Sequence, residues 1–179
     1  RHQTGNVVTA LETIFTLRTL GYYITSDAIR EGLRETVWPG RFTCLREKPF
    51  FFIDGAHNED AVKRLRESLE IYFPNKHFIY IMGVFRDKEY EKIAEIMAPL
   101  AKSVHTVNLP DTGRTLPAAK LAKVMERHCP KGIPIQAEET VENGVKKALI
   151  NARKEDVILA FGSLSYLGQV MTSFKRIST

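Results

Sequence analysis

Residues 49–58 read PFFFIDGAHN, and this stretch indicates both the fold of the chain and the place of its site. Residues 50–53 are apolar without alternation, which is typical of a strand that is covered by helices on both faces. Asp54, a glycine and His57 follow within four residues, and a helical pattern begins after Asn58, a residue type that caps helices. Ligands of open α/β sheets bind outside the carboxyl ends of the strands, so this strand end is a candidate binding site.

Apolar runs and amphipathic stretches alternate along the chain from about residue 42 onward. This alternation predicts an α/β fold with a Rossmann-like, mainly parallel sheet that is flanked by helices on both faces. Only three residues separate the first two strands, which predicts a hairpin and therefore an antiparallel edge strand. The predicted strands are 42–46, 50–53, 78–82, 104–109, 134–137 and 157–161, and the predicted helices are 59–73, 89–98, 117–128, 141–153 and a terminal helix that ends at 174.

The first forty residues differ from the rest because they contain helical patterns only. Residues 6–20 place apolar side chains on one stripe, and residues 28–35 form a second short helix. Two short helices do not make a domain, and Trp38-Pro39-Gly40 interrupts the pattern. We therefore expect residues 1–38 to be part of one domain and residues 39–179 to form a second. The chain begins close to a helix and without Met, so we expect a piece of a longer protein.

The composition restricts the classes of partner. With 26 basic and 21 acidic residues the chain carries a formal charge of +5, which favours anionic ligands. No cluster of lysine and arginine interleaves with aromatic residues, so we expect no nucleic acid as a partner. No apolar run reaches the length of a membrane span, so we expect no membrane partner either. Cys44 and Cys129 lack the CxxC spacing of zinc sites, and we identify no metal ligands in the sequence.

Three known site motifs are absent from the sequence. It contains no G-x-x-x-x-G-K-[ST] and no G-x-G-x-x-G, and residues 162–165 (GSLS) do not match G-x-S-x-G. These absences argue against a P-loop, a dinucleotide fingerprint and an α/β-hydrolase, in that order. A nucleotide-dependent enzyme would need its phosphate-binding loop outside this chain.

Three residues have chemistry that suits a nucleotide. The amide of Asn6 can donate to and accept from a base edge, or it caps the first helix. The guanidinium of Arg41 lies at the expected domain boundary, where it can reach a nucleotide or pair with a surface carboxylate. Asp54 can accept hydrogen bonds from both hydroxyls of a ribose at a strand end, or it begins a common Asp-Gly turn.

Three further residues suit anions or the chemistry itself. His57 lies close to the candidate strand end, or it is a solvent-facing loop residue. Lys88 can neutralise charge on a phosphate; alternatively, Asp87 caps the next helix and Lys88 lies in solvent. Ser163 begins the last helix, where a hydroxyl and backbone N–H groups suit a carboxylate, or it is a plain N-cap.

Several motifs together resemble one family. DGAHN at 54–58, GRF at 40–42, G-x-x-x-D-K at 83–88 and FGSLSYLG at 161–168 resemble the C-terminal domain of folylpolyglutamate synthase/dihydrofolate synthase. This family consists of ATP-dependent amide ligases of the Mur ligase superfamily. H-Q-x-x-N at 2–6 resembles the end of the family's central ATPase domain. The last motif departs from the family, because Ser165 stands where a tyrosine is usual and Tyr166 follows one place later.

The resemblance implies a role for each candidate. It implies that ATP is bound by Asn6, Arg41 and Asp54. It implies that glutamate is bound by His57 and Ser163, and that the catalytic residues are His57 and Lys88. The implied reaction adds glutamate to folate or dihydropteroate through an acyl phosphate, with ATP and Mg²⁺ as cofactors and the magnesium ligands outside this chain. It also implies a cytoplasmic enzyme with a missing N-terminal ATPase domain. Because the chain has no phosphate-binding loop of its own, we expect it to be inactive alone.

Two other interpretations remain open. A non-catalytic Rossmann-like module that binds a small anion or a protein would explain the fold, the basic charge and the absent phosphate loop. It would not explain why so many polar candidates fall at strand ends. Another Mur-type amino-acid ligase would share all these features, and only the resemblance separates folate from muramyl substrates.

Overall fold

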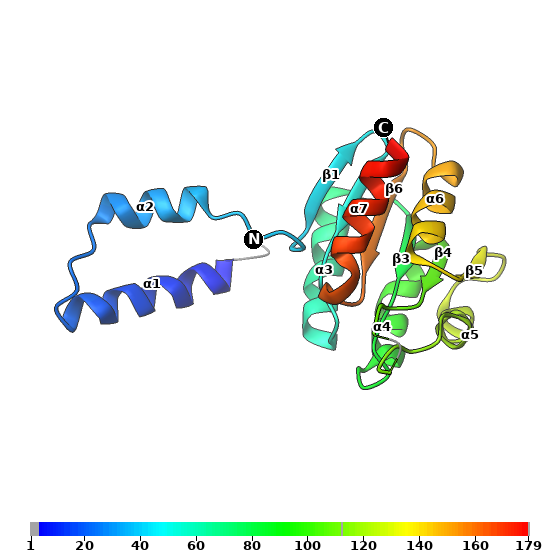
Figure 1. The fold of residues 1–179 in the computed structure, drawn as a ribbon, viewed down its shortest axis with the longest axis horizontal. Coiled ribbons are helices and arrows are strands. Elements are labelled where there is room, and N and C mark those ends of the chain that lie inside the picture. Colours follow the sequence, from blue (N-terminus) through cyan, green and yellow to red (C-terminus); the bar gives the residue numbers. More distant parts are fainter. Residues whose placement is uncertain (1–3, 112, 179) are drawn as a thin grey trace. The chain divides into compact units, whose positions relative to one another are not determined.

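The computed structural model describes residues 4–111 and 113–178, and the chain divides into two compact units, Arg1–Pro39 and Gly40–Thr179 (Figure 1). The first unit contains α1 (Thr4–Thr19) and α2 (Ser26–Glu35). Gly21, at φ 93°, follows the end of α1, and the Thr25 hydroxyl caps α2 by accepting a hydrogen bond from the Ala28 N–H at 3.1 Å. No residue from 5 to 39 is buried, so this unit has no core of its own.

The second unit is a six-stranded sheet with the strand order β1-β2-β6-β3-β4-β5. The antiparallel pair of β1 and β2 lies at one edge, and every other neighbouring pair is parallel. The sheet prediction and its antiparallel edge are therefore confirmed. The strands are β1 (Thr43–Glu47), β2 (Phe50–Ile53), β3 (Phe78–Met82), β4 (Ala101–Val107), β5 (Ile135–Glu138) and β6 (Val157–Phe161).

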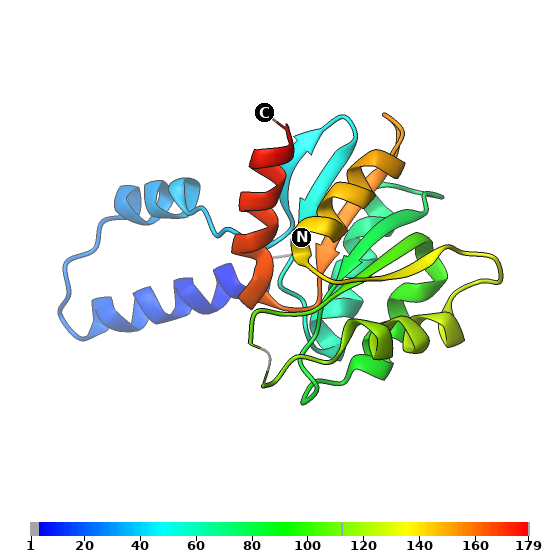
Figure 2. The ribbon, with the colours of Figure 1, turned by 45° about the vertical axis from the view of Figure 1, so that its right-hand side comes forward.

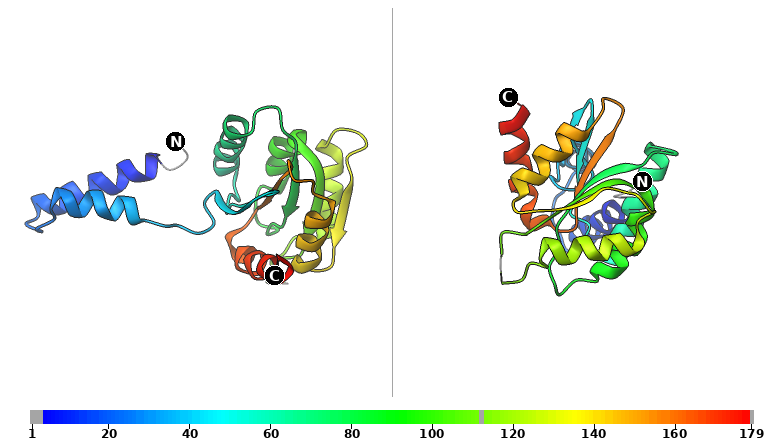
Figure 3. Two further views of the ribbon diagram at one scale, coloured as in Figure 1. Left: turned by 90° about the horizontal axis from the view of Figure 1, so that it is seen from above. Right: turned by 90° about the vertical axis from the view of Figure 1, so that its right-hand side faces the viewer.

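Helices cover both faces of this sheet (Figures 2 and 3). One face is covered by α3 (Glu59–Tyr72), α4 (Tyr90–Met97) and α5 (Ala118–His128), and the other by α6 (Val141–Asn151) and α7 (Leu167–Ser178). Two short 3₁₀ helices, η1 (Ala98–Leu100) and η2 (Leu164–Tyr166), complete the described elements. No helix among the described residues is long and apolar enough to cross a membrane.

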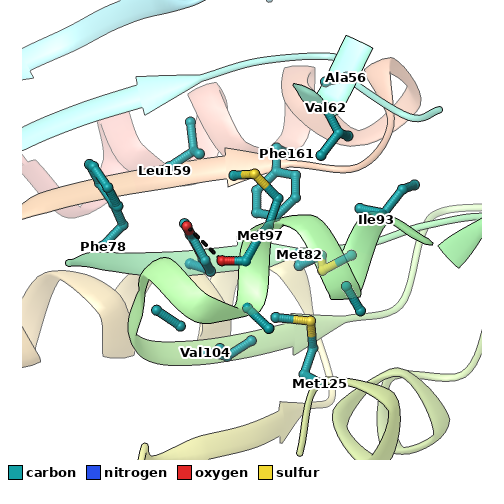
Figure 4. Packing of buried hydrophobic residues seen from close by; sticks show 14 of the residues in the cluster. Ala56, Val62, Phe78, Met82, Ile93, Met97, Val104, Met125, Leu159 and Phe161 are labelled. Atoms are coloured by element: carbon teal, nitrogen blue, oxygen red, sulfur yellow. Dashed lines mark hydrogen bonds between the residues drawn. The ribbon is translucent and has the colours of Figure 1, made fainter. Parts of the chain in front are cut away.

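The central strands are buried because both of their faces carry apolar side chains. Side chains of β3, β4 and β6 meet those of α3, α4 and α5 in one cluster (Figure 4). The alternate residues of β2, β3 and β6 form a second cluster with α6 and α7. This two-sided burial explains why residues 50–53 and 157–161 are apolar without alternation.

The predicted element boundaries differ from the observed ones by a few residues. The strand predicted at 104–109 begins at Ala101, because η1 leads directly into it and Ala101 pairs with Phe78. The first helix begins at Thr4 rather than at Asn6, so Asn6 lies inside α1, and the interpretation of Asn6 as its N-cap is wrong.

Candidate functional site at the strand ends

The carboxyl ends of three neighbouring parallel strands, β2, β6 and β3, lie at one edge of the sheet. The segments that follow them are residues 54–58, 162–166 and 83–88. Residues 40–42 reach the same edge from the opposite direction, because β1 is antiparallel and its Thr43 pairs with Ile53. We call these segments the strand-end site.

Backbone hydrogen bonds join three of these segments directly. The Gly55 N–H donates to the Gly40 carbonyl at 2.7 Å, and the Gly162 N–H donates to the Ala56 carbonyl at 3.0 Å. A Cβ on Gly55 would overlap the Leu164 side chain, which therefore packs directly over the glycine backbone. The motifs GRF, DGAHN and GSL are thus neighbours in space, although they are far apart in sequence.

Asp54 lies at the centre of this arrangement, and its carboxylate is almost fully buried, with 1% of the residue exposed. One carboxylate oxygen, Oδ2, accepts a hydrogen bond from the Phe42 N–H at 2.7 Å, and Oδ1 accepts one from the Ala56 N–H at 2.7 Å. Asp54 therefore holds the 40–42 turn against the end of β2. The sequence did not predict this structural role, and direct contact with a ribose stays a prediction.

Arg41 lies in the turn that Asp54 holds. Both of its neighbours have positive φ angles, 82° at Gly40 and 48° at Phe42. Phe42 accepts this uncommon conformation because its N–H binds Asp54 and its ring stacks on Phe52 at 4.7 Å. The Arg41 side chain is half-buried and forms no ion pair with any described residue, so its charge is available to an anionic ligand.

His57 is half-exposed and its orientation is set by its own loop. Its Nδ1 lies 2.7 Å from the Gly55 carbonyl oxygen, which can only accept, so Nδ1 carries the proton. In the neutral ring Nε2 is then the acceptor. Asn58 caps α3 by accepting from the Ala61 N–H at 2.9 Å, as its residue type suggested.

Ser163 is buried, with 4% exposed, and its hydroxyl accepts a hydrogen bond from the Ser165 N–H at 3.2 Å. It therefore caps η2, and not α7 as we expected, because three 3₁₀ residues precede α7. Tyr166 fills the interior behind it: its hydroxyl lies 2.9 Å from the Ile81 carbonyl oxygen and 2.7 Å from that of Phe161. Burial raises the pKa of Tyr166, so the hydroxyl stays protonated and links the ends of β3 and β6.

Lys88 belongs to a second cluster, in the segment that follows β3. Its Nζ lies 3.9 Å from Asp87 Oδ2, and the same carboxylate receives hydrogen bonds from Arg114 at 3.2 and 3.0 Å. The N-cap of α4 is Glu89, so the interpretation of Asp87 as the cap is wrong. Among the described residues, no hydrogen bond or ion pair joins Lys88 to Arg41, Asp54 or Ser163.

One candidate residue, Asn6, lies outside the sheet unit. Asn6 belongs to the first unit, whereas the strand-end site belongs to the second, and residues 2 and 3 of its motif lie outside the described residues. No cluster of three or more His, Cys, Asp or Glu side chains within residues 4–111 and 113–178 is arranged to hold a metal ion.

Two residues near the site were not predicted from the sequence. The role of Tyr166 as a link between strands was missed, and Arg114 was not a candidate at all, because no local pattern marks a partner 27 residues away.

The chain is similar to known proteins in sequence and in fold. The family model described as "Mur ligase, glutamate ligase domain" matches residues 40–164. The dihydrofolate synthase/folylpolyglutamate synthase of Bacillus subtilis is 26% identical over 153 residues, which is 86% of this chain and 34% of that protein. This chain therefore spans about a third of the length of that curated relative.

Solved structures share the fold. Escherichia coli FolC in complex with DHPP and ADP aligns with a TM-score of 0.84 at 23% identity, over 98% of this chain and 40% of that one. A bifunctional folylpolyglutamate synthase/dihydrofolate synthase with Mn, AMPPNP and L-glutamate bound aligns with a TM-score of 0.73 at 23% identity, over 86% of this chain and 36% of that one. The family model covers most of the chain and contains the strand-end site except for residues 165 and 166. The chain therefore belongs to the family described as "Mur ligase, glutamate ligase domain".

Proposed function

We propose that this chain is the C-terminal part of an ATP-dependent amide ligase that adds glutamate to folate or dihydropteroate through an acyl phosphate. The observation that carries the proposal is the meeting of three motifs at one sheet edge, through the Gly55–Gly40, Phe42–Asp54 and Gly162–Ala56 hydrogen bonds. The names of the relatives support the choice of folate over a muramyl substrate. They also support ATP and a divalent ion as cofactors and glutamate as a substrate.

Each candidate residue of the strand-end site has a proposed task. ATP, when bound, supplies the phosphoryl group that activates the substrate carboxylate. Arg41 binds the nucleotide through its guanidinium, which forms no ion pair with any described residue. Asp54 contributes to ATP binding mainly by holding the Arg41 turn. Ser163 and its neighbouring backbone orient the glutamate.

The remaining two candidates act nearer the reacting atoms. His57 presents Nε2 toward the reactants while Nδ1 stays bound to the Gly55 carbonyl. Lys88 stabilises negative charge on the acyl phosphate. The described residues offer no ligand cluster for Mg²⁺, so we propose that its protein ligands lie outside this chain.

We propose that residues 1–38 are the last helices of the central ATPase domain. Large apolar side chains there are exposed, including Phe15 at 51% and Trp38 at 69%, which supports a missing partner surface. The alignment with FolC covers 98% of this chain, and so includes most of this unit. Asn6 would then face the nucleotide base in the intact, cytoplasmic enzyme. The phosphate-binding loop lies outside the chain, so the chain alone is predicted to be inactive and to bind ATP no better than millimolar.

The test uses the full-length protein with ATP, glutamate and, in turn, dihydropteroate, tetrahydrofolate or a UDP-muramyl peptide. We expect glutamate-dependent ADP release and a product heavier by one glutamate with a pterin substrate. Arg41→Ala should raise the KM for ATP about tenfold or more, because a charge-assisted contact is lost. Arg64→Ala, an exposed arginine of α3, is the matched control and should leave the KM unchanged.

Different outcomes separate the alternatives. Turnover with the muramyl substrate alone would mean that the enzyme acts on another Mur-type substrate and not on folate. The absence of glutamate-dependent ADP release with all three substrates would favour a non-catalytic module. An Arg41→Ala enzyme with the wild-type KM for ATP would remove Arg41 from the nucleotide site.

A further inference from the structure

The segments that follow β3 and β4 form a small antiparallel bridge outside the sheet. The Leu116 N–H donates to the Val84 carbonyl at 3.0 Å, and the Arg86 N–H donates to the Arg114 carbonyl at 2.8 Å. Phe85 and Thr115 pair between these two bonds. The backbone of Arg114 is therefore held opposite the Asp87–Lys88 segment without help from the Arg114 side chain.

The Arg114 side chain is held on two sides. Its Cζ lies 4.4 Å from the centre of the Phe85 ring, which is a cation–π contact. One guanidinium nitrogen donates to both carboxylate oxygens of Asp87, at 3.2 and 3.0 Å. The hydrogen bond from Arg114 is the main cause that lowers the pKa of Asp87, so the carboxylate stays charged and engaged with the arginine.

Lys88 is a second cation beside the same carboxylate oxygen. Its Nζ lies 3.9 Å from Asp87 Oδ2, too far for a hydrogen bond, whereas the Arg114 nitrogen lies 3.0 Å from that oxygen. Without the guanidinium, the adjacent lysine is the nearest cation that Asp87 could engage. A lysine paired with its neighbouring aspartate would have less net charge to offer an anionic ligand.

We propose that Arg114 is a positioning residue that keeps Asp87 engaged and so leaves the Lys88 ammonium available to an anionic group of the substrate. This proposal rests on the proposed function only for the identity of that anion, a carboxylate or an acyl phosphate. The Arg114–Asp87 pair is about half-exposed, with side-chain exposures of 54% and 47%. Such pairs contribute little to folding stability, so variants at these positions should fold.

The first test measures the chemical reactivity of the Lys88 amine in the 179-residue chain and needs no enzymatic activity. The rate at which an amine-directed reagent labels Lys88 at mildly alkaline pH is followed by peptide mass spectrometry, with the exposed Lys123 as internal reference. Arg114→Ala should slow the labelling about threefold, because the Lys88 amine would then pair with the Asp87 carboxylate that Arg114 had engaged. The double variant Asp87→Asn/Arg114→Ala should label at the wild-type rate, because no carboxylate remains to hold the lysine.

The second test uses the full-length enzyme. We expect Arg114→Ala to lower kcat about fivefold with an unchanged KM for ATP, and the double variant with Asp87→Asn to recover to within about twofold of the wild type. In a Lys88→Ala background, Arg114→Ala should have no further effect. The control is Arg127→Ala, because Arg127 forms a similarly exposed pair with Glu91 at 2.6 Å on a neighbouring surface, and it should change neither readout.

The outcomes separate this proposal from a structural role and from the proposed function. Rescue of kcat by Asp87→Asn supports the proposal. A double variant that is as impaired as Arg114→Ala would mean that the ion pair only tethers the segment, and this result would overturn the proposal. Unchanged labelling of Lys88 in Arg114→Ala also overturns it. If the labelling changes as expected but Lys88→Ala leaves kcat intact, the inference about Arg114 stands and the proposed role of Lys88 in the ligase reaction fails.

Discussion

Asp54 shows how one side chain can organise a site without facing solvent. Its two oxygens accept from two backbone amides in different segments, and the residue is 1% exposed. A buried carboxylate is costly unless its oxygens are satisfied, and here the turn that carries Arg41 satisfies one of them. The position of Arg41 therefore depends on Asp54.

We predict that Asp54→Asn destabilises the chain by about 1–3 kcal/mol, because an amide can accept at only one of the two positions. The other position would place an NH₂ group against a backbone N–H. Urea unfolding at neutral pH measures the change. Asp60→Asn, at an exposed position in the first turn of α3, is the control and should cost only a few tenths of a kcal/mol, within the range of helix-dipole effects. Equal stability of Asp54→Asn and wild type would contradict the anchoring role.

A second buried polar group lies away from the site. His105 in β4 is 2% exposed, and its Nδ1 lies 3.1 Å from Glu138 Oε1, while Lys147 Nζ lies 2.9 Å from the other oxygen of Glu138. The Nε2 of His105 has no hydrogen-bond partner among the described residues. Burial lowers the pKa of His105, against the opposing effect of Glu138, so the ring is neutral in the folded state at neutral pH.

This pKa shift predicts an acid-sensitive fold. The unfolded chain binds a proton at His105 near pH 6.5, whereas the folded chain binds it only at lower pH, so stability falls as the pH drops below about 6.5. The slope is at most about 1.4 kcal/mol per pH unit for one proton. Urea unfolding between about pH 7 and 5 should show this loss, and His105→Gln should reduce it. His77→Gln, at an exposed position, should retain the full loss, and an identical pH dependence in His105→Gln would contradict the assignment.

At the scale of elements, the turn from β6 into η2 decides how closely the strand ends approach. Gly162 has φ 110°, and a Cβ there would overlap the carbonyl oxygen of Gly83 at the end of β3. The same turn donates the Gly162 N–H to Ala56 and begins the η2 segment that covers Gly55. Three segments of the site therefore meet through one glycine.

We predict that Gly162→Ala destabilises the sheet unit by more than about 2 kcal/mol, because the φ angle is unfavourable for alanine and the contact is with backbone. Gly168→Ala is the matched control. The structure shows no contact within 4 Å of the added Cβ from the described residues beyond its own helix, and alanine favours the helix by up to about 1 kcal/mol. Thermal and urea unfolding of both variants measure the difference. A Gly162→Ala protein as stable as Gly168→Ala would contradict the close approach of the two strand ends.

At the scale of the whole molecule, all buried residues among those described belong to the second unit. The sheet has a core on each face, whereas the two helices of the first unit bury none of their described residues. Short helices without tertiary contacts are marginal in water. The stability of this chain therefore lies in residues 40–179.

We predict that removal of residues 1–39 leaves the urea midpoint of the sheet unit unchanged. The peptide 1–39 alone should show little helix by far-ultraviolet circular dichroism, because its apolar side chains have no core to enter. A markedly lower midpoint in the truncated chain would mean that the first unit stabilises the second. A concentration-dependent midpoint in the 179-residue chain, lost on truncation, would mean that the exposed helices associate between copies.

The sequence by itself determined the layered fold and the edge at which the site lies. Continuous apolar runs at 50–53, 78–82 and 157–161 could only be buried on both faces, and amphipathic stretches between them required parallel strands with helical crossovers. The polar residues after Ile53 and Phe161 were therefore predictable as neighbours at one edge. These are local patterns, and local patterns can be recognised in the sequence without knowing which groups each residue contacts in the folded chain.

Only the tertiary structure decided what each polar side chain contacts. Asp54 binds the Phe42 amide twelve residues away, and Asp87 binds Arg114 across two segments, instead of capping its own helix. Ser163 caps a 3₁₀ turn that the hydrophobic pattern of the sequence does not predict. Tyr166 joins strands that are distant in sequence. Hydrogen bonds and ion pairs form between whichever groups the packed backbone brings within about 3 Å, and that distance is set by the whole fold.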